Sequence, residues 1–141
     1  MEQYEINPIE RYVTVFKALS DMTRLKIMWL LLSIDSKICA SEIIDVLNEN
    51  QYNVSKHLKI LLNAGLIYKK KEGKWTFYYY RSGDEGFDSE VRRTVMSIPG
   101  ELMAGEVARC RKRLAMRVDG KCVIGGNSNE WMEISNAGED C

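Results

Sequence analysis

The sequence of 141 residues predicts a mainly helical α+β domain that carries a single β-hairpin. Apolar residues recur at helical spacing over most of the chain, beginning with residues 9–19. The pattern changes at residues 67–81, where Trp75 and Phe77 belong to an alternation typical of a strand. Glu72-Gly73 lies within this stretch, before Trp75, and is a two-residue hairpin connection, at which glycine supplies the positive φ that such a turn needs.

Four helices are expected before the hairpin. Asn7 followed by Pro8 is typical of a helix start, so the first helix begins there. A second helix starts near Ser20-Asp21, and its continuous apolar run predicts that it is the central buried helix. The third covers residues 42–47 behind a Ser41 cap, and the fourth covers residues 51–66 with Gly65 as its stop.

The chain after the hairpin is predicted to be helical again, at residues 90–98 and from 101 to about 118. Pro99-Gly100 separates these two segments, and Gly120 is expected to end the second. Residues 1–124 therefore form one domain, which the chain length also favours. Residues 125–141 are polar and contain glycine, so a weakly ordered tail is predicted for them.

The net charge of zero conceals an uneven distribution. Residues 51–81 hold 7 basic and 1 acidic side chains, whereas residues 1–50 hold 5 and 8, and residues 82–141 hold 8 and 11. A basic patch on one unit is expected of a phosphate binder, although a solvated lysine run on an ordinary hairpin is the alternative. A polar helix beside a basic hairpin favours a winged helix-turn-helix, in which the helix reads the DNA major groove and the hairpin contacts nearby phosphates.

Several classes of protein are not expected. The chain has no early apolar run, and its longest apolar stretch, residues 27–32, is too short to cross a membrane. A cytoplasmic protein without a membrane partner is therefore predicted, in which four cysteines are thiols rather than disulfides. No glycine-rich phosphate loop, nucleophile elbow or paired-histidine motif occurs, so we expect neither an enzyme nor a catalytic cofactor.

Three motifs, in order, resemble the ArsR/SmtB family of bacterial metal- and metalloid-responsive transcriptional repressors. Residues 18–27 resemble the family's opening motif, residues 54–67 its recognition helix and residues 72–80 its wing, and the match covers about residues 9–81. The resemblance implies a homodimer, paired through its first and last helices. It also implies that the dimer binds a palindromic double-stranded DNA operator and releases it when an inducer binds.

Carried over residue by residue, the resemblance places DNA contacts on the fourth helix and on the hairpin. Amide side chains suit adenine, helix lysines suit guanine edges or phosphates, and hairpin lysines add affinity. The single histidine has an alternative role as a partly buried residue with local hydrogen bonds. The predicted DNA-binding residues are Gln51, Asn53, Ser55, Lys56, His57, Lys59, Lys70, Lys71 and Lys74.

The cysteines predict a thiolate sensor. Arsenic-type members of the family carry Cys-x-Cys at the start of the third helix, but here Ser41 follows Cys39 at the second position. Zinc-type members use histidine and carboxylate ligands on the last helix, and this chain has no histidine there. Cys110 lies in a basic stretch that favours a thiolate, and Cys122 follows it. Continuous helix would separate these two sulfurs by roughly 18 Å, so sharing one ion requires that Gly120 turn the chain back or that the other subunit contribute.

The predicted inducer is a trivalent arsenical, either arsenite or methylarsenite. Its ligands are Cys110 and Cys122, with Cys39 or Cys141 as a third. The alternative is a dithiol switch, in which Cys110 and Cys122 or Cys39 oxidise to a disulfide or persulfide. Cys39 could instead be a buried apolar residue, and Cys141 an incidental thiol.

Overall fold

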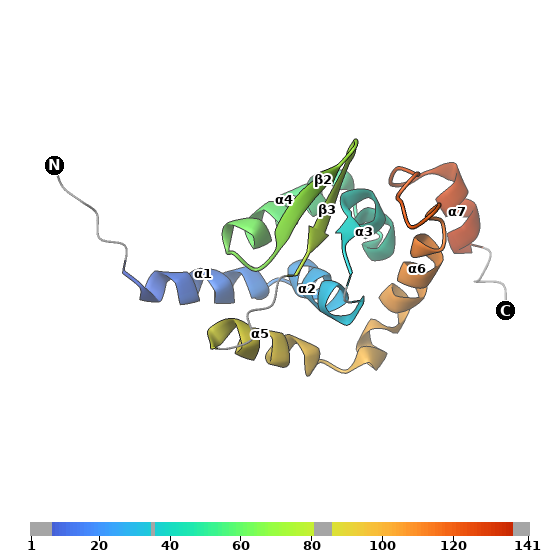
Figure 1. The fold of residues 1–141 in the computed structure, drawn as a ribbon. Helices are drawn as coiled ribbons and strands as arrows, with labels where there is room; N and C mark the ends of the chain where they lie inside the picture. Colours follow the sequence, from blue (N-terminus) through green and yellow to red (C-terminus); the bar gives the residue numbers. More distant parts are fainter. Residues whose placement is uncertain (1–6, 35, 81–85, 137–141) are drawn as a thin grey trace.

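The computed structural model describes residues 7–34, 36–80 and 86–136 (Figure 1). The mainly helical fold with a β-hairpin is the one that the sequence predicts. In chain order the elements are α1 (Ile9–Leu19), α2 (Met22–Ile34), β1 (Ile38–Cys39), α3 (Ala40–Leu47), α4 (Gln51–Asn63), β2 (Tyr68–Glu72), β3 (Trp75–Tyr79), α5 (Phe87–Met96), the 3-10 helix η1 (Gly100–Met103), α6 (Ala104–Leu114) and α7 (Asn129–Asn136).

Helix α2 is the centre of the core, as predicted. Residues 27–32 are all buried, and the helix contacts α1, α4 and α5. Asp21 begins the helix by accepting a hydrogen bond from the Arg24 N–H at 3.1 Å. Each large aliphatic side chain that is buried here contributes about 1.5–3 kcal/mol, so this helix organises the other elements around itself.

Helices α3 and α4 form the helix-turn-helix. Asn48 ends α3 in the left-handed region, and Asn50 caps α4 by accepting a hydrogen bond from the Asn53 N–H at 2.8 Å. Helix α4 buries Val54, Leu58 and Leu61 against the core, which turns its polar positions outward. It ends at Asn63, earlier than predicted, because Gly65 takes a φ of +74° and closes the helix.

The hairpin belongs to a three-stranded antiparallel sheet with the order β1-β3-β2. Glu72 pairs with Trp75, so the connection is Gly73-Lys74, one residue later than the predicted Glu72-Gly73. Strand β1 was not predicted, since two residues are too few for a periodic pattern. Its pairing aligns Cys39 with Phe77 and thereby joins the start of α3 to the wing.

The C-terminal part differs most from the prediction. Helix α6 ends at Leu114, and Gly120, with a φ of +72°, forms a tight turn in which Val118 and Lys121 pair. Helix α7 forms within residues 125–141, for which weak order was predicted. It forms because the Trp131 side chain is buried and the Trp131 backbone N–H donates to Ser128 Oγ. Helix α5 lies beside α1, whereas α6 and α7 lie at the opposite end of the molecule (Figure 1). No helix in the described ranges is long and apolar enough to cross a membrane.

Candidate functional site

Helix α4 presents a polar outer face of the kind that a DNA-reading helix needs. Gln51, Ser55, Lys56 and Lys59 are exposed, while Asn53 is half-buried and its amide donates to Glu49 Oε2 at 3.2 Å. Tyr52, which the sequence analysis did not select, is 76% exposed on the same helix. A phenol at the start of a reading helix can donate to phosphate or pack on sugar, so Tyr52 belongs to this surface.

His57 has a structural position. Its Nδ1 lies 3.1 Å from Arg24 Nη1 and 3.8 Å from Asp21 Oδ2, and its side chain is 14% exposed. Arg24 also donates to the Ala18 carbonyl at 2.6 Å. The ring therefore links α4 to the start of α2, which is the local hydrogen-bonding role that the sequence left open.

The wing carries the basic part of the surface. Lys70, Lys71 and Lys74 are all exposed, and the ammonium of Lys74 lies 5.0 Å from the centre of the Trp75 ring. Cations on an exposed hairpin beside a polar helix can neutralise DNA phosphates on either side of a groove. The predicted lysines thus share a surface-exposed element.

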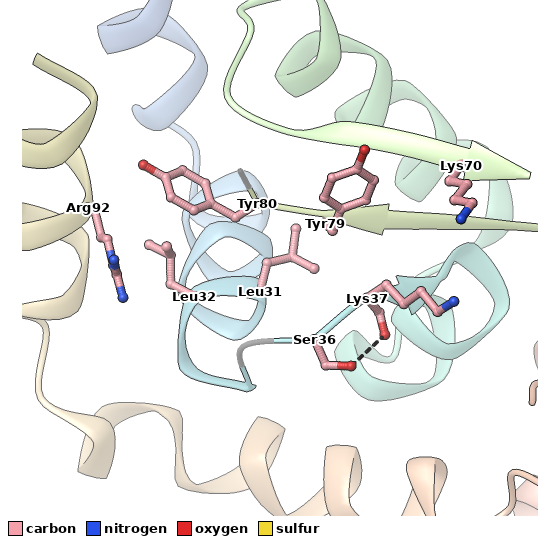
Figure 2. A pocket seen from close by; sticks show the side chains of 8 residues that line it. All are labelled: Leu31, Leu32, Ser36, Lys37, Lys70, Tyr79, Tyr80 and Arg92. Atoms are coloured by element: carbon pink, nitrogen blue, oxygen red, sulfur yellow. Dashed lines mark hydrogen bonds between the residues drawn. The ribbon is translucent and has the colours of Figure 1, made fainter. Parts of the chain in front are cut away.

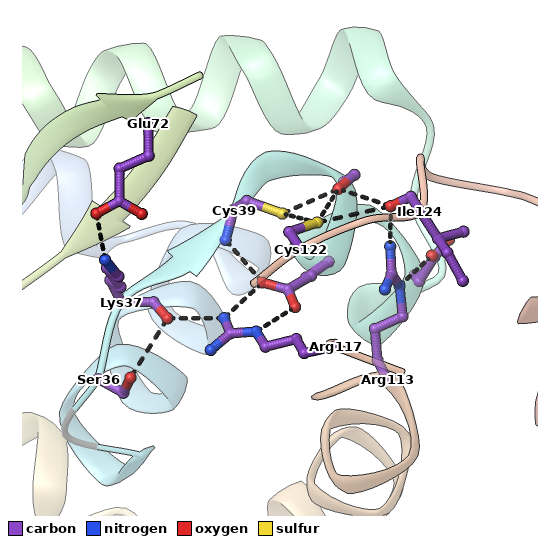
Figure 3. A network of polar contacts seen from close by, with 11 residues as sticks. Ser36, Lys37, Cys39, Glu72, Arg113, Arg117, Cys122 and Ile124 are labelled. Atoms are coloured by element: carbon purple, nitrogen blue, oxygen red, sulfur yellow. Dashed lines mark hydrogen bonds and ion pairs between the residues drawn. The ribbon is translucent and has the colours of Figure 1, made fainter. Parts of the chain in front are cut away.

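A buried thiol pair lies between the wing and α3 (Figure 3). The sulfur atoms of Cys39 and Cys122 are 3.0 Å apart, and the two residues are only 1% and 3% exposed. Ser41 Oγ lies 2.9 Å from Cys39 Sγ and 3.5 Å from Cys122 Sγ. Two thiols and a hydroxyl therefore meet at one point, although Cys39 and Cys122 are far apart in sequence.

Asp45 of α3 holds the C-terminal segment over the thiol pair. Asp45 accepts a hydrogen bond from Arg113 Nε at 2.7 Å through one carboxylate oxygen, and from the Asn127 N–H at 2.7 Å through the other. Arg113 Nη2 in turn donates to the Ile124 carbonyl at 2.6 Å. Because Arg113 and Asp45 side chains are 1% and 0% exposed, this pair fixes the path of the chain that carries Cys122.

Glu42 is the third potential ligand in the group, but its carboxylate is already occupied. Among the described residues, Cys39, Glu42 and Cys122 bring ligand atoms within 4.8 Å of one another. Glu42 Oε1 accepts from the Cys39 N–H at 3.0 Å and from Arg117 Nη2 at 2.7 Å, and Oε2 accepts from Arg117 Nε at 2.7 Å. A divalent cation here would have to displace the guanidinium of Arg117 from a buried carboxylate, so the chemistry of the site rests on the thiols.

Burial makes Cys39 a neutral thiol. Desolvation, followed by the hydrogen bond with Cys122, raises the pKa of Cys39 to about 12. The sulfur is therefore protonated at neutral pH, and a ligand that bonds to it must displace this proton.

The structure does not bring Cys110 to Cys122, contrary to the expected pairing. Cys110 is 4% exposed and belongs to the main core, beside Trp29 and Leu30 of α2. Burial raises the pKa of its thiol, whereas the basic stretch around it was expected to favour a thiolate. Gly120 does turn the chain back, but it delivers Cys122 to Cys39. Cys141 lies outside the described residues.

A separate cavity of about 670 Å³ lies between the end of α2, the wing and α5 (Figure 2). Three cationic side chains, Lys37, Lys70 and Arg92, line it together with the rings of Tyr79 and Tyr80. Lys37 is also paired with Glu72. This lining contains no cysteine, so the cavity is chemically distinct from the thiol pair.

The helix-turn-helix, its exposed polar helix and the basic wing define the class: a winged helix-turn-helix DNA-binding regulator. Residues 21–69 match the family model for the bacterial regulatory proteins of the arsR family. A transcriptional regulator of Methanocaldococcus jannaschii, MJ1325, is 43% identical over 79 residues, which are 56% of this chain and 82% of that protein. The arsenical resistance operon repressor of Bacillus subtilis is 37% identical over 78 residues, which are 55% of this chain and 73% of that protein.

The solved structures agree with this assignment. HlyU from Vibrio cholerae aligns with a TM-score of 0.55 at 26% identity, covering 70% of this chain and 97% of that one. The chain therefore belongs to the ArsR family, whose members are transcriptional regulators rather than enzymes.

Proposed function

We propose that this ArsR-family regulator represses transcription as a homodimer on a palindromic operator, and that a trivalent arsenical releases it by bonding to Cys39 and Cys122. The observation that carries the proposal is the buried contact of 3.0 Å between the two sulfur atoms. The relatives from Bacillus subtilis and Escherichia coli that are named arsenical resistance operon repressors support the choice of inducer. Cys39 and Cys122 remain from the predicted ligand set, and Cys110 is left out because it lies in the core.

The bonding step needs no charged intermediate in the buried site. Each arsenic–sulfur bond forms as a thiol loses its proton and arsenic loses a hydroxyl group, and the two leave together as water. Arsenic stays trivalent throughout. Because soft trivalent arsenic prefers sulfur to oxygen ligands, the thiols, and not the surrounding carboxylates, are the groups that select it.

The position of Cys39 connects the thiols to both DNA-contacting elements. Its backbone pairs with Phe77 in the wing, and its N–H is held by Glu42 at the start of α3. A sulfur that moves to accommodate arsenic therefore displaces strand β1, and with it the wing and the helix-turn-helix. An inducer that binds the DNA-free conformation more tightly, by about 1–3 kcal/mol, is sufficient for typical coupling between sites.

Dimer formation is supported by the apolar face of α1. Ile9 and Phe16 are 58% and 59% exposed, and Phe16 and Tyr12 contact Phe87 of α5 through their rings. An exposed apolar surface built from two adjacent helices is suited to a two-fold interface, in which the same patch is used by both copies.

The test is operator release, measured by fluorescence anisotropy of a labelled duplex under a phosphine reductant. We expect Cys39→Ser and Cys122→Ser to bind the operator normally and to resist phenylarsine oxide, methylarsenite and arsenite. Cys110→Ser is the matched control, since it removes a buried thiol outside the pair, and it should respond like the wild type. Normal release of both Cys39→Ser and Cys122→Ser by these arsenicals would contradict the proposal.

The same sulfur contact favours a second candidate, a dithiol redox switch. Two thiols at this distance can lose two protons and two electrons to a peroxide, forming a disulfide and two molecules of water. Release by peroxide without an arsenical, reversed by the reductant and absent in Cys122→Ser, is the result that this second mechanism requires.

A further inference from the structure

We propose that the Cys39–Cys122 pair selects trivalent arsenicals that carry one organic group, and that this group lies in the cavity between the wing tip and the turn at residues 118–121, against Trp75. This inference rests on the proposed function, because it assumes that the thiol pair is the inducer site. It adds the class of arsenical and the place that its substituent occupies.

The number of thiols sets the class of ligand. Arsenite has three exchangeable hydroxyl groups, so three thiols are needed to replace them. An arsenical with one carbon substituent has two such groups, and two thiols replace both: RAs(OH)₂ and two Cys–SH give RAs(S-Cys)₂ and two water molecules. In the described part of the chain, two thiols meet at this site, while Cys110 lies in the main core. The product is neutral and keeps arsenic trivalent, which suits a buried position.

The side-chain oxygens near the thiol pair are poorly placed to supply a third bond to arsenic. Ser41 Oγ is within 2.9 Å of Cys39 Sγ and also donates to the Ile124 carbonyl at 3.4 Å. The two oxygens of Glu42 accept three hydrogen bonds from Arg117 and the Cys39 N–H. The adjacent guanidinium also repels divalent cations, so cadmium and zinc are disfavoured relative to a neutral arsenical.

The space for an organic group adjoins Cys122. A cavity of about 670 Å³, within the usual range for small-molecule sites, is bounded by the wing tip on one side and the 118–121 turn on the other. Its apolar wall consists of Trp75, Phe77 and Val123, and Trp75 packs directly against the buried cluster of Cys39, Phe77 and Cys122.

The opposite side of the pair is less suitable for an apolar group. There a cavity of about 440 Å³ borders Cys39 and Ser41, and polar side chains such as Gln51, Ser55 and Asn127 contribute to its lining. Trp75 borders both cavities, but the larger one adds Phe77 and Val123, so an aromatic or alkyl substituent gains more apolar contact there. Because Gly73 and Lys74 of the wing turn also line the larger cavity, a group bound there lies directly beneath the wing.

The test measures binding to the DNA-free protein, with Cys141→Ser as the background so that a terminal thiol cannot contribute. The probes are phenylarsine oxide, methylarsenite, arsenite and cadmium, and the readouts are the adduct mass and the dissociation constant from tryptophan fluorescence. We expect one phenylarsenic adduct per chain, lost in Cys39→Ser and in Cys122→Ser. Affinity should fall in the order phenylarsine oxide, methylarsenite, arsenite. Cadmium should bind more weakly than phenylarsine oxide.

Two variants test the place of the substituent. Trp75→Ala should weaken the binding of phenylarsine oxide by about three- to tenfold, which is the value of one aromatic contact. The binding of arsenite should stay unchanged. Trp75→Phe keeps an apolar ring and should retain most of the affinity, and Trp131→Phe in α7 is the control that changes a tryptophan elsewhere. Trp75→Phe and the order of the wild-type affinities remain decisive if Trp75→Ala folds poorly.

The inference is overturned if arsenite binds as tightly as phenylarsine oxide, or if Trp75→Ala weakens both equally. It is also overturned if arsenite binding is lost on introducing Cys141→Ser, since that would reveal a three-thiol site. Failure of the proposed function looks different: phenylarsine oxide would bind the thiol pair with the expected preference, but the operator complex would stay intact.

Discussion

Arg113 and Arg117 decide where the C-terminal segment lies. In the sequence Arg113 belongs to the basic run around Cys110 that suggested an activated thiol, but in the structure each of the two guanidinium groups is paired with an acidic residue of α3. Arg113 contacts Asp45 and Arg117 contacts Glu42, at 2.7 Å in both cases. The side chains of both acids are 0% exposed, so each charge depends on its partner. These pairs position the segment that carries Cys122.

Arg113→Ala should lower the free energy of unfolding by about 3–5 kcal/mol, because it leaves the buried Asp45 carboxylate without its counter-charge. Chemical denaturation followed by circular dichroism measures this change. Arg111→Ala, an exposed neighbour on the same helix, is the control and should stay within about 0.5 kcal/mol of the wild type. Equal effects of the two substitutions would show that the buried pair does not hold the segment.

The Cys39 thiol gives stability a dependence on alkaline pH. Its pKa in the folded protein is raised to about 12 from an ordinary value of 9.0, so the folded state holds the proton more tightly. The stability that comes from the neutral thiol is complete below pH 9 and is lost as pH rises toward 12. The stability difference between the wild type and Cys39→Ser should therefore shrink over this interval, by at most about 1.4 kcal/mol per pH unit. A difference that stays constant from pH 8 to 11 in urea titrations would contradict this assignment.

In the proposed mechanism strand β1 links the thiol pair to the DNA-contacting elements, although it is only 2 residues long. It pairs with β3 of the wing at one side and continues into α3 at the other. The wing and the helix-turn-helix are therefore joined by one short strand that contains Cys39. We expect the wing and α4 to have separate roles in DNA binding, since lysines dominate the wing and amides and hydroxyls begin α4.

The double substitution Lys70→Ala and Lys71→Ala should weaken binding to cognate and random duplexes equally. It should also flatten the plot of log affinity against log salt by about one unit for each lost phosphate contact. Anisotropy titrations over a range of salt concentrations measure both effects, with Arg111→Ala as a matched loss of exposed positive charge. An unchanged slope would place the phosphate contacts elsewhere.

Gln51→Ala, by contrast, should reduce affinity for the cognate operator more than for random DNA, by about 1–3 kcal/mol if the amide forms a paired contact with adenine. Competition between cognate and scrambled duplexes measures the difference. Asn53→Ala is an informative comparison, because the Asn53 amide is already hydrogen-bonded to Glu49 and should contribute less. A larger loss for Asn53→Ala than for Gln51→Ala would reverse this assignment.

The whole molecule has two different ends (Figure 1). At one end α1 and α5 lie together, with Tyr12 and Phe87 rings 4.7 Å apart and an exposed apolar face. At the other end α6 and α7 pack, and α6 contacts α3. The family resemblance implied pairing through the first and last helices. In this chain α5 accompanies α1, so we expect α1 and α5 to form the dimer surface and the C-terminal helices to serve the sensor.

Phe16→Glu should convert the dimer to a monomer at micromolar concentration, because it places a charge in the centre of the apolar face. Operator affinity should fall with it, since both half-sites can no longer be held at once. Sedimentation velocity measures the assembly state. Met132→Glu is the control, as Met132 is 51% exposed at the opposite end in α7. A monomeric wild type, or a dimer that survives Phe16→Glu, would show that this face is not the interface.

The sequence by itself determined the local elements and the class of protein. The buried run of α2, the polar α4 and the alternating wing follow from periodicities within one element, which depend only on neighbouring residues. The uneven charge indicated a protein that binds phosphates. The resemblance of the three ordered motifs implied a winged DNA-binding regulator of the ArsR family. Cys39 and Cys122 could also be selected as sensor candidates, since thiol chemistry belongs to the side chain.

Only the tertiary structure decided which thiols meet. Cys39 and Cys122 are 83 residues apart, and their contact depends on β1 pairing with the wing, on the turn at Gly120 and on the ion pair of Arg113 with Asp45. None of these leaves a periodic pattern, because each joins distant elements through a few side chains. Cys110 was assigned to the wrong environment because its basic neighbours are close in sequence. Its own position on α6 turns it into the apolar core, and that direction is set by what packs against the helix.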